Sequence, residues 1–180
     1  IRNDDGAVES GSFRPSLQFD FKSTAKIDLS LTSNYESVRD TFALAGGAEV
    51  PAGDYWFHEA NLDVATSRLG SFRPNLTVGA GSFYDGYRLT FSSGPSWNVS
   101  RHLELGGGYT LNVVRFNDRD VSLDTHLLSM RIQAALDIHL SLSTLAQYTS
   151  TGDLASVNAR LRYHLSHGND LWLVYGEGFN

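Results

Sequence analysis

Apolar and polar residues alternate strictly over residues 26–35, and this period of two constrains the fold more than any other feature of the chain. In a β-strand, successive side chains point to opposite faces, so such a run makes one apolar wall and one polar wall. The apolar positions of the run are Ile27, Leu29, Leu31 and Tyr35. A strand of about ten residues is also long enough to cross a bilayer when it is tilted.

The same alternation returns almost from end to end and predicts an all-β chain of about ten strands. Strands of soluble proteins average about five or six residues, whereas several of these runs keep their phase for ten residues or more. No stretch keeps the 3.6-residue apolar period of an amphipathic helix. The predicted strands are residues 13–22, 26–36, 55–68, 75–84, 87–99, 103–116, 122–136, 140–148, 154–164 and a last one that begins at 171–175.

Two further regularities favour a transmembrane barrel over a soluble barrel or sandwich. Short connections (23–25, 69–74, 100–102, 137–139 and 166–170) alternate with longer ones (37–54, 117–121 and 149–153), although the Asp85-Gly86 hairpin breaks this rule. Membrane barrels have short periplasmic turns and longer outer loops. Aromatic residues also gather near the strand ends, as expected at a lipid–water interface. We therefore predict an antiparallel up-and-down transmembrane β-barrel, with a soluble all-β binding module as an alternative.

Composition narrows the class of protein. The chain has 180 residues, no cysteine and a net charge of −6, which argues against disulfides, thiolate metal sites and nucleic acid as a partner. No window of about 18 apolar residues predicts a transmembrane helix. Residues 1–11 lack apolar periodicity and predict a linker or loop, followed by barrel over 12–180. Because no signal segment opens the chain, we expect a mature protein or a fragment of a longer one.

The last strands carry a recognisable pattern. An arginine-rich strand over Arg160–Tyr163 is followed by the turn Gly168-Asn169-Asp170 and by the strand Leu171–Gly178, which reads LWLVYGEG. This order resembles the C-terminal barrel of bacterial outer-membrane proteins that place a carbohydrate-binding family 9-like domain before a barrel of unassigned function. The run over residues 140–153 is similar as well.

The resemblance has three implications. In that family one further strand follows, so the ten strands here would be part of a larger barrel that lacks its closing strand and upstream strands. An upstream domain or a partner chain would complete it. A carbohydrate would be a possible solute, and the bacterial outer membrane would be the location.

The best candidates for functional residues are the charged residues at the polar positions of the predicted strands. Ionised groups cannot face hydrocarbon cheaply, so an inward row of charges implies either water or mutual pairing. The row predicts a solute path whose selectivity the charges set, or a lumen plugged by cross-strand salt bridges. The predicted lumen-facing residues are Lys26, Asp28, Glu59, Asp63, Arg88, Glu104, Arg131, Arg160 and Arg162.

One motif suggests a different function. His164 and Ser166 share one face of a strand, so the imidazole could deprotonate the hydroxyl, and Asn169 lies nearby. The arrangement is similar to the His-x-Ser pair of outer-membrane phospholipase A, which implies a lipid hydrolase. The alternative is that these three residues are ordinary polar residues of a hairpin turn and have no catalytic role.

We therefore expect an outer-membrane barrel, porin-like or transporter-like, surrounded by lipid and passing carbohydrate or another small solute. The alternatives are the lipid hydrolase and the soluble binding module. No cofactor or metal site is predicted, and enzymatic activity is left open.

Overall fold

A computed structural model describes residues 8–44, 49–116, 120–166 and 168–180, and every regular element among them is a strand. The main antiparallel sheet contains 13 strands, and a second sheet pairs two short strands, β4 and β5. The described residues contain no helix long and apolar enough to cross a bilayer. The first strands are β1 (Ser10–Phe13), β2 (Ser16–Asp20), β3 (Lys26–Val38), β4 (Phe42–Ala43), β5 (Glu49–Val50), β6 (Gly53–Ala65), β7 (Phe72–Arg73) and β8 (Asn75–Phe83). The others are β9 (Gly86–Ser93), β10 (Ser96–Ser100), β11 (Leu103–Phe116), β12 (Val121–Ala135), β13 (Leu140–Thr149), β14 (Leu154–Ser166) and β15 (Asn169–Phe179).

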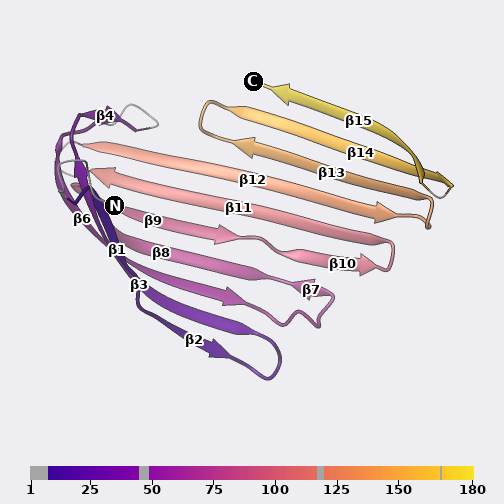
Figure 1. Ribbon diagram of the computed structural model, residues 1–180, viewed down its shortest axis with the longest axis horizontal. Coiled ribbons are helices and arrows are strands. Elements are labelled where there is room, and N and C mark those ends of the chain that lie inside the picture. Colours follow the sequence, from indigo (N-terminus) through magenta and orange to yellow (C-terminus); the bar gives the residue numbers. More distant parts are fainter. Residues whose placement is uncertain (1–7, 45–48, 117–119, 167) are drawn as a thin grey trace.

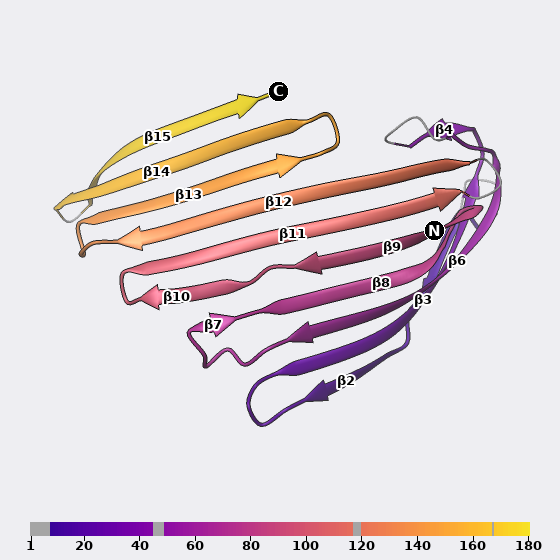
Figure 2. The ribbon, with the colours of Figure 1, turned by 180° about the vertical axis from the view of Figure 1, so that it is seen from behind.

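The main sheet follows chain order, β1-β3-β6-β8-β9-β11-β12-β13-β14-β15, with β2 beside β3 and β10 beside β11. The predicted all-β, antiparallel, up-and-down order is therefore confirmed. A closed barrel is not found. Figures 1 and 2 show one twisted, curved sheet with β2 and β15 at opposite margins. Among the described residues, β15 pairs with β14 alone.

Three prolines interrupt strands without ending the sheet. Pro15 separates β1 from β2, Pro74 separates β7 from β8, and Pro95 separates β9 from β10. Proline cannot donate a ladder hydrogen bond, yet each proline carbonyl accepts one from the neighbouring strand, at distances of 2.8–3.2 Å. The register therefore continues across each break, and each interrupted pair occupies the place of one long strand.

Other differences from the predicted elements have local causes. The predicted strand 13–22 begins earlier, at Ser10, so β1 enters the segment predicted as linker; residues 1–7 of that segment lie outside the described residues. The predicted turn 69–74 contains β7, which pairs with β10. The predicted loop 37–54 contains the β4–β5 hairpin. Strands of two residues are too short to show an alternating pattern.

The register assigns every strand residue to one of two faces. Directly opposed residues of an antiparallel pair share a face, so Asp28, Asp63, Thr77 and Ser92 lie on one side of the sheet. We call this side the polar face. The apolar face begins with Leu29, Leu62, Val78 and Phe91, which are opposed in the same way.

The apolar face has no covering layer in the part of the chain that the structure describes. Leu31 is 62% exposed and Leu173 is 68% exposed, near the two margins of the sheet. Among the residues that the structure describes, only Val38, Val50, Val114 and Phe116 are buried hydrophobic residues. The total accessible surface is 12102 Å², about 3500 Å² above the roughly 8600 Å² expected for a compact soluble monomer of 19.8 kDa. The chain alone is therefore not a compact globule.

Candidate functional site

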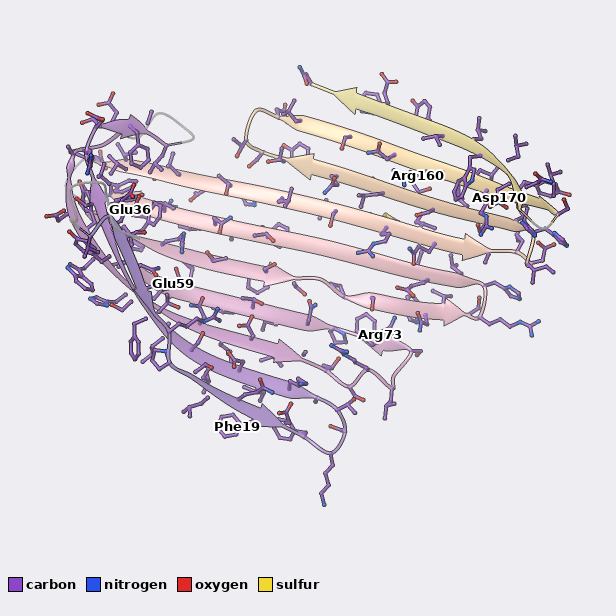
Figure 3. All side chains as sticks on the ribbon, viewed as in Figure 1. Phe19, Glu36, Glu59, Arg73, Arg160 and Asp170 are labelled. Atoms are coloured by element: carbon purple, nitrogen blue, oxygen red, sulfur yellow. The ribbon has the colours of Figure 1, made fainter. Side chains whose placement is uncertain are left out.

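All nine residues predicted to face a lumen share the polar face. Asp28 lies opposite Asp63, Gly81 lies between Glu59 and Arg88, and the remaining charges follow the same parity on later strands. Figure 3 labels Glu59 on the N-terminal strands and Arg160 on the C-terminal strands. The common face follows from the register, whereas its lining a lumen stays a prediction.

On the N-terminal strands, most charges of the polar face are paired or hydrogen bonded. Arg88 forms an ion pair with Glu59, and Lys26 lies 3.0 Å from Asp20 on β2. The Thr77 hydroxyl donates to Asp63 over 2.6 Å. Two further cross-strand bonds of 2.9 Å join Thr90 to Asn112 and Ser92 to Thr110. This part of the face is a hydrogen-bonded polar surface.

On the C-terminal strands, an aromatic ring and a carboxylate hold one arginine in place. Arg162 lies 2.9 Å from Asp170, and its guanidinium lies 5.7 Å from the centre of the Trp172 ring. Arg131 and Arg160 have no hydrogen-bond or ion-pair partner among the residues that the structure describes. Arg160 and Arg162 line a hollow of about 750 Å³, together with Gln133, Ser143, Trp172 and others. This flank therefore has free donors on a concave surface.

Several polar-face residues escape the sequence analysis. Arg73 donates to Ser96 and Asn98, each over 3.1 Å, and lies 3.7 Å from Glu104. The chain around it reads SFRP, as it does at residues 12–15, where Arg14 donates to Ser30 over 3.0 Å. In both repeats, the arginine just before the proline that interrupts a strand forms a hydrogen bond with a residue of a neighbouring strand on the polar face. The repeated SFRP motif is the sequence feature from which the position of Arg73 on the polar face could have been predicted. Asp170 falls in the predicted turn 166–170, whereas β15 begins at Asn169. Trp172 falls in the predicted last strand, but the prediction of lumen-facing residues rests on charge alone and so omits it.

An apolar cluster covers one end of the polar face, where the strands meet the longest connection. Val114 and Phe116 form its centre, with Leu44, Phe83, Tyr84, Val121 and Leu123 packed around them. Leu44 directly follows β4, and the ring of Phe42 in β4 lies 5.9 Å from the Tyr84 ring. Tyr84 also donates from its hydroxyl to Glu36 over 3.2 Å. The cluster attaches the β4–β5 hairpin to this end of the sheet.

The ionisation of Tyr84 makes the stability of this cluster depend on pH in the alkaline range. The residue lies in the turn between β8 and β9, where burial and the neighbouring Glu36 raise the pKa of its phenol to about 12. The folded state favours the neutral phenol, so its contribution to stability is complete below pH 10 and is lost as the pH rises to about 12. Tyr84→Phe should remove this dependence in urea unfolding measured across that range. Tyr175→Phe, on the exposed β15, is the control, and an unchanged pH profile in Tyr84→Phe would contradict the assignment.

The candidate hydrolase residues lie at the β14–β15 turn and make other contacts. Nδ1 of His164 lies 2.7 Å from Asp170, and the amide of Asn169 donates to the Ser166 hydroxyl over 3.2 Å. The register shifts between His164 and Ser166, which disturbs the regular i, i+2 spacing on which the motif depends. The structure therefore pairs Asn169 with Ser166 and Asp170 with His164, and the hydrolase stays a prediction.

Metal binding receives no support from the described part of the chain, where no group of three or more histidine, aspartate or glutamate side chains could hold a metal ion. A scan against models of protein families, a search of curated proteins and a search of solved structures each found no match. The resemblance to outer-membrane barrels that follow a carbohydrate-binding family 9-like domain thus remains a prediction.

Proposed function

We propose that the chain is the barrel-forming part of a bacterial outer-membrane protein and that its polar face lines a passage for small polar solutes. Its apolar face would contact lipid acyl chains. The observation that carries the proposal is the exposed apolar face, which runs from Leu31 on β3 to Leu173 on β15 without a covering layer among the described residues. Soluble monomers rarely expose a continuous apolar patch larger than a few hundred Å².

Strand length and the position of polar residues agree with a membrane setting. The strands β11 and β12 have 14 and 15 residues, more than the roughly 9–11 that a tilted strand needs to cross the hydrocarbon core. On the apolar face of β12, Leu128, Met130 and Ile132 occupy the middle, whereas Asp124 and His126 lie toward the β11–β12 connection. An apolar stretch that gives way to polar side chains toward the β11–β12 connection agrees with the lipid-facing band of membrane barrels.

Further strands are needed to close the sheet. In hydrocarbon each unsatisfied backbone group costs several kcal/mol, so an open sheet edge is not stable there. The two margins, β1–β2 and β15, would therefore pair with strands from an upstream domain of the same protein or from a partner chain. The passage would take carbohydrate or another small solute. The choice of carbohydrate rests on the family resemblance alone.

Reconstitution tests this function directly. The purified protein, including any further strands of its reading frame, is inserted into planar lipid bilayers and into liposomes. We expect stepwise ion conductance, and faster liposome swelling in small neutral sugars than in sugars too large for the passage. Protein that inserts but neither conducts nor accelerates swelling would contradict a solute passage. Protein that stays folded and monodisperse in buffer without detergent would contradict the membrane setting itself.

A further inference from the structure

The unpaired arginines of the polar face point to a ligand chemistry. We propose that Arg131 and Arg160, assisted by Arg162, form an oxyanion-binding subsite on the C-terminal strands, for a small solute that carries a carboxylate or a phosphate group. The inference rests on the proposed passage for its role in transport. The binding step itself requires only the folded sheet.

On the C-terminal strands of the polar face, the arginines outnumber the carboxylates that pair with them. On the C-terminal strands Asp170 neutralises Arg162, and Glu104 lies 3.7 Å from Arg73. Arg131 and Arg160 have no such partner within the described ranges, and both side chains are exposed on the polar face. A protein with a net charge of −6 therefore keeps two uncompensated cations on one flank of this face.

The neighbours of Arg160 provide the other hydrogen-bond donors. Ser143 lies directly opposite Arg160 in the register, and Gln133 lies opposite Ser143 on the next strand. Strands are spaced by about 4.8 Å, so this row spans about 10 Å from Arg160 to Gln133. That width suits one carboxylate or phosphate group held between side chains. A planar guanidinium also matches the oxygen geometry of these groups.

Arg162 and Trp172 make one wall of the same hollow rigid. The lining of the hollow of about 750 Å³ includes Arg160, Arg162, Gln133, Ser143, Trp172 and also Glu104, whose carboxylate lies 3.7 Å from Arg73. Arg131 is not part of this lining and lies two residues before Gln133 on the same face of β12. The bond from Arg162 to Asp170 fixes that guanidinium over the Trp172 ring. A cation held in this orientation favours binding of an anion in the adjoining space.

The opposite flank of the polar face has the opposite charge. Asp28 and Asp63 face each other across β3 and β6, where two like charges on one row repel. Asp63 accepts a bond from Thr77, and Asp28 has no hydrogen-bond or ion-pair partner within the described part of the chain. This flank would repel the anion that the arginines attract, so the ligand would bind on the C-terminal strands.

Binding is tested on detergent-folded protein through the tryptophan of the hollow. In a Trp56→Phe, Trp97→Phe background, Trp172 is the only tryptophan of these 180 residues, and its emission is followed as inorganic phosphate, gluconate or glucose is added. We expect saturable changes with phosphate or gluconate and none with neutral glucose. Which of the two anions binds more tightly distinguishes a phosphate from a carboxylate ligand. Each of Arg131→Gln and Arg160→Gln should weaken binding about fivefold, the effect of removing one charge at about 4 Å in water.

Controls and a second readout separate this inference from the proposed passage. Arg115→Gln removes an arginine of the apolar face, paired with Asp124 at the loop end, and should leave binding unchanged. In bilayers, the Arg131→Gln, Arg160→Gln double variant should lower the permeability of chloride relative to potassium. Binding without conductance would overturn the passage and leave the subsite. Conductance without saturable anion binding, or equal responses to glucose and phosphate, would overturn the subsite alone.

Discussion

Arginine in place of Met130 should destabilise the folded protein in a bilayer by about 2–4 kcal/mol, because the side chain lies in the middle of the apolar face and a cation there would enter hydrocarbon. Met130 is 52% exposed, so the longer side chain meets no steric barrier. The free energy of unfolding is measured by urea denaturation in lipid vesicles. The same substitution in detergent micelles should cost less, because a micelle admits water more readily.

Gln147→Arg is the matched control. Gln147 lies opposite Ser129, next to the Met130–Ala146 pair, but it points to the polar face. Both substitutions replace a long unbranched side chain and add one positive charge. Gln147→Arg should change the free energy of unfolding by less than about 1 kcal/mol, as surface substitutions commonly do. Equal losses in the two variants would mean that lipid does not contact the apolar face.

Alanine at Gly81 should cost about 1–3 kcal/mol, the usual range for atoms forced into an occupied space. Gly81 lies between Glu59 and Arg88 in the register, beside their ion pair. A Cβ atom there would overlap the His58 carbonyl oxygen and lie 2.5 Å from Cα of Glu59. These are backbone atoms, so relief requires the two strands to move apart. Urea unfolding of the variant measures the loss.

Gly107→Ala is the control for this effect. Gly107 also lies within a central strand, but a Cβ there meets its nearest neighbour, Cγ of Pro95, at an ordinary 3.6 Å. Because alanine restricts the unfolded chain more than glycine does, this variant should be neutral or slightly stabilised. A Gly81→Ala protein as stable as Gly107→Ala would show that β6 and β8 are not pressed together at this point.

The period of two was sufficient to predict most of the sheet. A half-exposed strand must alternate, so β3, β6 and β11 to β15 could be located from their residues alone. The same parity put nine charged residues on one face, and the register agrees for every one of them. The alternation predicts the faces reliably because a register shift of one residue would move every apolar side chain of a strand to the polar face.

The remaining features depend on contacts that alternation does not encode. Nothing in the pattern shows that Leu44 packs near Phe116, since that contact depends on how a long connection folds back. The partner of His164 is Asp170 across a hairpin, rather than the nearer Ser166 in the chain. The alternation likewise does not encode strand partners for the two margins of the sheet, and within the described residues β15 pairs with β14 alone.

The central claim is that the apolar face meets acyl chains while the polar face meets water, and the three tryptophans test it directly. Trp56 and Trp97 lie on the apolar face, and Trp172 lies opposite Arg162 on the polar face. In single-tryptophan variants reconstituted in lipids brominated along the upper acyl chain, we predict strong quenching of Trp56 and Trp97. Trp172 should instead be quenched by iodide in the aqueous phase. Quenching of Trp172 by the lipid bromines, or of Trp56 and Trp97 by iodide alone, would contradict the account.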